Sequence, residues 1–287
     1  MIISQTRKLK RFMSSKHPTF FTLLGKAKHF VRHWDTKRSL HDKQNKIVFS
    51  KIFAKNLWEG GESESGSGSS LEQTTTISDQ LPFFLKALGV KSVLDAGCGD
   101  LNWLHHMDLT LETYIGVDVV GALVARNREM YGNKKRSFLV RDITKDRLPK
   151  VELIFCRDCL GHFSFIDIHA AVRNFKRSKS TYLLTTTFPK HDLSVDIQTG
   201  YWRPLNLQLP PFNFPRPIRL INEHCSEDDN AYTDKSLGLW RISELPGSRS
   251  LWGFLKEQAA HCFRERNVLA AWAILDDGLY EIIPFLP

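Results

Sequence analysis

The stretch Lys91-Ser-Val-Leu-Asp-Ala-Gly-Cys-Gly-Asp100 decides the fold of this chain. Residues 92–95 are short and mostly apolar, as in a buried strand, and Gly97 and Gly99 follow directly. Two glycines at this point permit a tight turn and a close approach of the backbone to a ligand. The sequence therefore predicts a strand, a glycine turn, and a helix over residues 101–107 that begins at the turn.

The regions around this stretch repeat the alternation of strand and helix. Further strands are expected at 114–118, 137–141, 152–156, 181–187 and 236–242, and helices at 74–88, 121–131 and 165–175. Alternation at this spacing predicts the α/β class, with a Rossmann-like, doubly wound, mostly parallel sheet. A helix at about 251–265 and closing strands at 269–275 and 279–283 complete the prediction.

Acidic residues end three successive predicted strands. Asp95 closes the first strand, Asp118 the second and Asp142 the third, and Ile143 follows Asp142. Ligands of such sheets bind at the carboxyl ends of the strands. A carboxylate at Asp118 can accept both hydroxyls of a ribose, Asp142 can accept from an adenine amine, and Ile143 can pack on the base. The three strand ends together predict a nucleoside site.

This ordered set of residues resembles the class I S-adenosylmethionine (SAM)-dependent methyltransferases, over roughly residues 74–242. The resemblance implies SAM as cofactor, held by Asp95, Gly97, Gly99 and the two later acids. One departure is Leu101, because many members have a third glycine there. The alternative is an NAD-dependent oxidoreductase, which needs the motif Gly-x-Gly-x-x-Gly. It would also place a negatively charged pyrophosphate beside the acid Asp100, whereas SAM is cationic at its sulfur and amine and suits an acid there better.

The segment Cys156-Arg-Asp-Cys-Leu-Gly-His162 follows the fourth strand, where this fold faces the transferring methyl group. Asp158 and His162 are the candidate catalytic acid/base groups, since an imidazole titrates near neutral pH. A purely structural interpretation stays open for both: Asp158 would cap the next helix, and His162 would be a packed polar residue. The Cys-x-x-Cys-x-x-His spacing matches a zinc half-site, but no second ligand pair is evident, so no metal is expected.

Residues 189–235 interrupt the alternation with six prolines and several aromatic residues. A loop this long inside a compact domain is usually functional or disordered, and its aromatics argue against disorder. Trp202, Arg203 and Asn206 are the candidate substrate contacts, able to stack on and hydrogen-bond a sugar or a base. The alternative is a proline-rich cover that packs on the core.

The chain falls into three predicted parts: a basic helical N-terminal arm (1–58), a Ser/Gly-rich active-site arm or linker (59–73), and the SAM-binding domain (74–287). The combination of the Trp58–Ser/Gly run, Arg157-Asp-Cys and Trp202-Arg-Pro-Leu-Asn206 resembles a bacterial-type group of these methyltransferases with poorly defined substrates. That resemblance implies that Ser65 and Ser67 belong to the cofactor site.

Charge and cysteine content limit the partners. Residues 1–58 carry 14 Lys/Arg against two Asp, whereas the rest of the chain is slightly acidic, so nothing indicates nucleic-acid binding by the domain. The basic arm suits either a membrane-peripheral or organelle-targeting segment or a simple packed helix. Five scattered cysteines and no apolar run of 18 residues favour a cytoplasmic protein with reduced thiols.

The expected function is methyl transfer to a small polar or glycan-like acceptor, through oxygen. A non-catalytic SAM-binding protein is the main alternative. The acceptor itself and the oligomeric state are left open.

Overall fold

The computed structural model describes residues 45–58 and 61–247. The chain divides into two compact units, residues 1–47 and 48–287, and the features below belong to the second. Most of the predicted basic arm lies outside the described residues, as do the predicted helix at 251–265 and the two closing strands. Within the predicted N-terminal helix, residues 45–54 are helical.

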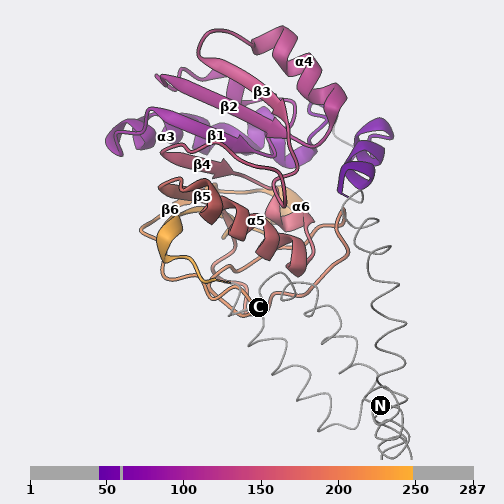
Figure 1. The fold of residues 1–287 in the computed structure, drawn as a ribbon. Helices are drawn as coiled ribbons and strands as arrows, with labels where there is room; N and C mark the ends of the chain where they lie inside the picture. The colour runs from indigo at the N-terminus through magenta and orange to yellow at the C-terminus, as the bar shows by residue number, and fades with distance from the viewer. Residues whose placement is uncertain (1–44, 59–60, 248–287) are drawn as a thin grey trace, which may run out of the picture. The chain divides into compact units, whose positions relative to one another are not determined.

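The described residues form one sheet of seven strands in the order β3-β2-β1-β4-β5-β7-β6 (Figure 1). The strands are β1 (Ser92–Ala96), β2 (Thr113–Asp118), β3 (Arg136–Val140), β4 (Leu153–Cys156), β5 (Tyr182–Thr187), β6 (Arg219–Asn222) and β7 (Ser236–Arg241). Strands β1 to β5 pair in parallel, and β7 runs antiparallel to both β5 and β6. The prediction of a mostly parallel Rossmann-like sheet is confirmed.

Two of the described helices begin at a serine cap. The elements are α3 (Leu71–Ala87), α4 (Gly121–Tyr131), α5 (Phe165–Ser178) and the short α6 (Glu227–Asn230). The Ser70 hydroxyl accepts from Gln73 N at the start of α3, and the Ser164 hydroxyl accepts from Asp167 N at the start of α5. Each such cap satisfies one of the free N–H groups of the first turn.

The predicted helix at 101–107 is wrong. The structure has only a single 3-10 turn, η2 (Leu104–His106), after the glycine turn. Leu101, the first residue of the predicted helix, adopts the left-handed conformation, with φ 58°. That conformation costs a residue with a side chain about 1–2 kcal/mol. The Leu101 side chain is only 2% exposed, so its burial offsets the cost.

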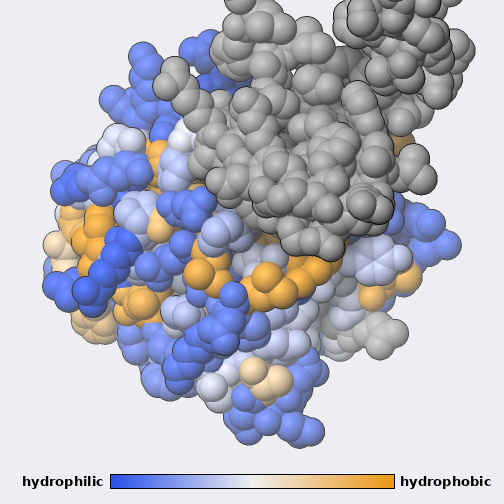
Figure 2. All heavy atoms as spheres, turned by 90° about the horizontal axis from the view of Figure 1, so that it is seen from below, coloured by the Kyte–Doolittle hydropathy of each residue, from blue (hydrophilic) through white to orange (hydrophobic). Residues whose placement is uncertain are grey.

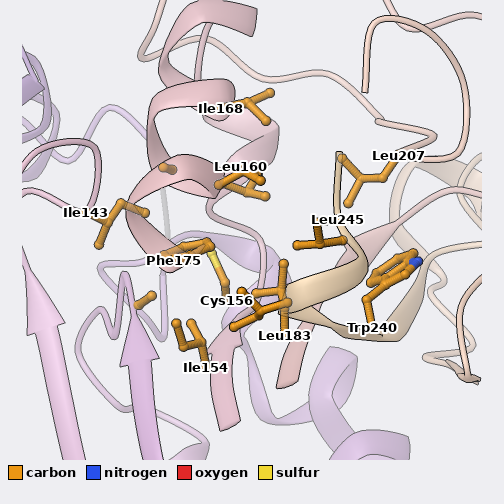
Figure 3. Packing of buried hydrophobic residues seen from close by; sticks show 14 of the residues in the cluster. Ile143, Ile154, Cys156, Leu160, Ile168, Phe175, Leu183, Leu207, Trp240 and Leu245 are labelled. Carbon is orange, nitrogen blue, oxygen red and sulfur yellow. The ribbon is translucent and has the colours of Figure 1, made fainter. Parts of the chain in front are cut away.

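Both faces of the sheet are covered, and this explains why the central strands are almost continuously apolar. All four residues of β4 are buried. Figure 3 shows one of the two core clusters: Ile154 and Cys156 of β4 and Leu183 of β5 lie near Leu160 and Phe175. The strands are therefore held rigidly, and the loops at their carboxyl ends are positioned by this core.

The prolines and aromatics of residues 189–217 fold into a packed loop, but the rest of the predicted cover does not stay irregular. Phe212 and Phe214 are buried in the core, as the cover interpretation expected. Strand β6 and the turn α6 lie within the range that was predicted to be loop throughout. Strand β6 was missed because it is a four-residue edge strand with Arg219 and Leu220 exposed, so its pattern is weak.

The surface mixes polar and apolar residues. On the face shown in Figure 2, orange apolar groups alternate with blue polar ones. Several exposed apolar side chains belong to the loop after β5, among them Leu193, Val195 and Tyr201. Within the described residues, none of the helices has both the length and the apolar content that a bilayer crossing requires.

Candidate active site

The glycine turn after β1 has the geometry that the sequence predicts. Gly97 and Gly99 have φ 81° and 57°, which favour glycine. The carbonyl of Val117 accepts from Gly97 N at 2.9 Å and Cys98 N at 3.0 Å, so the turn is tied to the end of β2. This brings the turn beside Asp118, the last residue of that strand.

Asp118 is the strand-end acid best placed to receive a ribose. One oxygen accepts from Val120 N at 2.9 Å and the other from Gly99 N at 3.3 Å. Burial raises the pKa of Asp118, while these backbone bonds act to lower it. A carboxylate has about four lone-pair sites, so two hydroxyls can still be accepted. The position and acceptor oxygens of Asp118 therefore fit the SAM ribose.

Asp95 has a different environment from Asp118. Its side chain is buried, and the Tyr114 hydroxyl donates to it at 2.5 Å. Burial raises the pKa of Asp95 to about 7, although the Tyr114 hydrogen bond opposes the shift. The carboxyl thus holds β1 to β2 under the glycine turn, and its predicted contact with the cofactor stays a prediction.

At the end of the third strand, the Asp142 carboxylate also bonds to its own turn. Asp142 accepts from Thr144 N at 3.0 Å and from the Thr144 hydroxyl at 2.6 Å, which shapes the turn after β3. Ile143 is 4% exposed and packs in the core cluster shown in Figure 3. The adenine contacts predicted for these two residues stay predictions.

The Ser/Gly run packs against the glycine turn and is not a free linker. Asp100 accepts from the Ser63 hydroxyl at 2.9 Å, from Glu64 N at 2.8 Å and from the Ser65 hydroxyl at 3.1 Å. A Cβ atom on Gly99 would collide with the Ser65 hydroxyl. Asp100 thus anchors this arm beside the glycine turn.

The other end of the arm borders a cavity of about 220 Å³ at the carboxyl ends of β4 and β5 and the start of β7. The Ser67 hydroxyl donates to Glu227 at 2.6 Å, and the Gly68 carbonyl accepts from Arg157 at 2.8 Å. The cavity is lined by Trp58, Ser65, Gly66, Ser67, Gly68, Ser69, Asp158, His162, Trp202, Glu227, Asp228, Tyr232 and Lys235. Both predicted catalytic residues, and the Ser65–Ser69 arm, thus share one site.

A network of charges forms one wall of the cavity. Lys235 Nζ lies 2.6 Å from an Asp158 oxygen, and Arg157 lies 3.2 Å from the same oxygen. Arg157 also pairs with the buried Glu223 at 2.8 Å. Burial acts to raise the pKa of Asp158, but Lys235 and Arg157 outweigh it and hold that pKa at about 2. Asp158 is therefore a permanent anion, poorly suited to accept a proton.

His162 is neutral in this site. Its Nδ1 lies 3.0 Å from the Tyr201 carbonyl, which can only accept, so Nδ1 carries the proton and Nε2 keeps its lone pair. The Trp58 ring is 4.8 Å from the imidazole, centroid to centroid. Burial lowers the pKa of His162 to about 4, although Asp158 acts to raise it. A neutral imidazole with a free Nε2 can serve as a base.

The three predicted substrate contacts separate in the structure. Trp202 lines the cavity and meets Tyr232 edge to face, with ring centroids 4.9 Å apart. Arg203 is buried and donates to the carbonyls of Leu160, Gly161, Phe163 and Val195. Asn206 donates to the carbonyls of Pro189 and His191. Arg203 and Asn206 do not line the cavity, so their role here is to fix the shape of the loop.

Sequence reasoning missed several residues of the site, above all Lys235, Tyr232 and Glu227. Glu227 holds the arm through Ser67 and lies 3.6 Å from Lys235 Nζ. A lysine directly before the apolar strand β7 was the available signal. In the Cys-x-x-Cys-x-x-His segment, Cys156 is buried in the core, and among the described residues no group of three or more His, Cys, Asp or Glu is placed to hold a metal.

The sheet order, the glycine turn and the strand-end Asp118 define a class I methyltransferase, whose methyl donor is SAM. Comparison with protein families agrees, because a methyltransferase-domain family model matches residues 71–240, and the chain belongs to that family. No curated protein matched the chain. The family decides against the NAD-dependent alternative.

Three solved structures are similar to the chain over part of its length. The methyltransferase domain of bacterial CtHen1 is 19% identical, with a TM-score of 0.36 over 40% of this chain and 66% of that one. Magnesium protoporphyrin IX methyltransferase of Synechocystis PCC 6803 with bound SAM is 20% identical, with a TM-score of 0.41 over 53% and 80%. DesVI of Streptomyces venezuelae is 15% identical, with a TM-score of 0.36 over 44% and 56%. The chain thus spans less than two thirds of the CtHen1 domain and of DesVI.

Proposed function

We propose that this methyltransferase methylates a hydroxyl group of a small polar or glycan-like acceptor. The observation that carries the proposal is His162, a neutral imidazole that lines the cavity with Nδ1 bound to a carbonyl and with no hydrogen bond at Nε2 within residues 45–58 and 61–247. A hydroxyl needs to lose its proton as it attacks a methyl group, so a positioned base is useful there. An amine acceptor that is already nucleophilic would need less help.

In this proposal each residue of the site has a separate role. SAM, when bound, supplies a methyl group attached to a positively charged sulfur. Asp118 holds the ribose hydroxyls, and the arm around Ser65 covers the glycine turn. His162 Nε2 accepts the proton that the acceptor hydroxyl loses. Asp158 stabilises the protonated imidazole, because its own charge is retained at neutral pH.

The size and walls of the cavity support an acceptor of about one sugar ring. Its volume of about 220 Å³ is small, and Trp202 and Tyr232 provide the aromatic surface on which an apolar ring face packs. The predicted membrane-peripheral role of residues 1–58 stays a proposal, supported by their excess of Lys and Arg. A cytoplasmic location is a proposal of the same standing.

Calorimetry with SAM and a radiolabelled methyl-transfer assay on a panel of hydroxyl, amine and thiol compounds test the proposal. The expected result is SAM binding together with transfer to hydroxyls, which His162→Gln reduces about 100-fold. His106→Gln, at an exposed histidine outside the cavity, is the matched control and should leave transfer unchanged. SAM binding without transfer to any class would favour the non-catalytic alternative, and transfer to amines alone would refute the hydroxyl acceptor.

A further inference from the structure

The charges around the cavity do not balance. Two cations, Arg157 and Lys235, face three carboxylates, those of Asp158, Glu223 and Glu227. All five groups are buried or partly buried, where charge interactions are screened less than in water. One oxygen of Glu223 is buried without a hydrogen-bond partner among the described residues. The network therefore carries a surplus negative charge.

The ammonium group that lines the cavity cannot offset this surplus. Lys235 is only 5% exposed, and its Nζ lies 2.6 Å from Asp158, 3.6 Å from Glu227 and 3.9 Å from Glu223. Its charge is thus already engaged by the carboxylates of the network. His162 also adds no charge at neutral pH, since burial lowers its pKa to about 4.

Asp228 adds a second negative charge at the same cavity. Its side chain is exposed, lines the cavity, and makes no ion pair within the described part of the chain. Asp228 and its neighbour Asp229 have nearly the same left-handed backbone, with φ 48° and 53°. Only Asp228 lines the cavity, so the pair offers a matched comparison.

Aromatic rings line the same cavity and add a second attraction for a cation. Trp58, Trp202 and Tyr232 line the cavity together with these acids. The face of an aromatic ring attracts a cation, and indole attracts it most strongly. A pocket that combines aromatic rings with uncompensated carboxylates favours a cationic ligand over a neutral one, and it disfavours a phosphorylated or carboxylated ligand.

We infer that the acceptor carries a cationic group, such as a protonated amine, which binds between Asp228 and the aromatic rings while the hydroxyl to be methylated lies at His162. This inference rests on the proposed function and specifies its substrate class. Within it, Asp228 is a residue that determines specificity and takes no part in the proton transfer. Neutral glycans are the competing class of acceptor, and the test below distinguishes them from cationic acceptors.

Choline and 3,3-dimethyl-1-butanol are suitable probes, because they share shape and hydroxyl group and differ in charge. Their dissociation constants are measured by ligand-observed NMR on the full chain with S-adenosylhomocysteine present. We expect choline to bind about tenfold more tightly. Asp228→Asn should reduce this preference at least threefold, whereas Asp229→Asn should change it by less than about twofold, and added salt should weaken it.

Equal binding of the two probes, binding of neither, or equal effects of the two substitutions would overturn the inference. Transfer of a methyl group to neutral hydroxyls with no preference for choline would leave the proposed function standing and remove only the cationic class. Preferential choline binding in a protein that transfers no methyl group would remove the proposed function and leave the cationic ligand class standing. The two failures are therefore distinguishable.

Discussion

The buried ion pair between Arg157 and Glu223 allows a quantitative test of the network that joins the arm to the sheet. Arg157 Nε and Nη2 lie 3.2 and 2.8 Å from the same Glu223 oxygen, and Nη2 also donates to the Gly68 carbonyl at 2.8 Å. The two side chains are 4% and 1% exposed. Arg157→Met would leave the Glu223 carboxylate buried, with Lys235 Nζ 3.9 Å away as its nearest cation.

Removing one partner of a buried ion pair costs about 3–5 kcal/mol of unfolding free energy, because the other charge is left uncompensated. Lys235 provides partial compensation, so we expect the lower end of that range, about 3 kcal/mol. A chain of this size changes its melting temperature by roughly 2–4 °C per kcal/mol. The expected decrease for Arg157→Met is therefore roughly 6–12 °C.

Urea and thermal unfolding of Arg157→Met, Glu223→Gln and the double variant measure this coupling. The double variant should recover most of the loss, since neither member of the Arg157–Glu223 pair is then left buried without the other. Arg126→Met is the control, because the Arg126–Glu64 pair is 40% and 45% exposed and should contribute less than about 1 kcal/mol. A loss below about 1 kcal/mol in Arg157→Met, or strictly additive losses in the double variant, would refute the reasoning.

Three further predictions concern the cofactor, the base and the arm. Asp118→Ala should weaken SAM binding by about 1–3 kcal/mol in calorimetry, through loss of hydrogen bonds to a carboxylate; unchanged affinity in the folded variant would remove its assignment to the ribose. The pKa of about 4 for His162 means that methyl transfer should fall as the pH drops through 4, where the imidazole protonates, and a midpoint near 6.5 in the pH–rate profile would contradict this environment. Gly99→Ala should displace the Ser65 hydroxyl and make the arm more sensitive to proteolysis. Adding Ser65→Gly should relieve the collision but not the left-handed strain at residue 99. Equal protease resistance of Gly99→Ala and wild type would show that the arm does not pack there.

The sheet could be predicted because its signals are local. Strand burial follows from four or five consecutive apolar residues, and helix starts follow from serine caps such as Ser164. The helix predicted after the glycine turn failed for a backbone reason. The apolar spacing of residues 101–107 is helical, but Leu101 lies in the left-handed region, and no property of leucine reveals that.

The chemistry of the site was harder to predict, because the relevant partners are distant in sequence. Asp158 could be placed at the end of β4, yet its pKa depends on Lys235, which lies at the start of β7. The Ser67 hydroxyl bonds to Glu227, 160 positions away, and Arg157 reaches a carbonyl 89 positions away. A pattern of residue types shows which groups reach the carboxyl edge of the sheet but not which of them pair there.

That pairing changes the chemical assignment of the two candidate groups. Sequence position alone makes Asp158 and His162 equivalent, since both follow β4 and both can accept a proton. Lys235 and Arg157 hold Asp158 as an anion with a pKa of about 2, whereas burial keeps His162 neutral and the Tyr201 carbonyl holds its proton on Nδ1. A permanent anion beside a neutral base stabilises the cation that forms when the base takes a proton. Lys235, whose pairing with Asp158 the sequence does not show, is therefore the residue that separates the two roles.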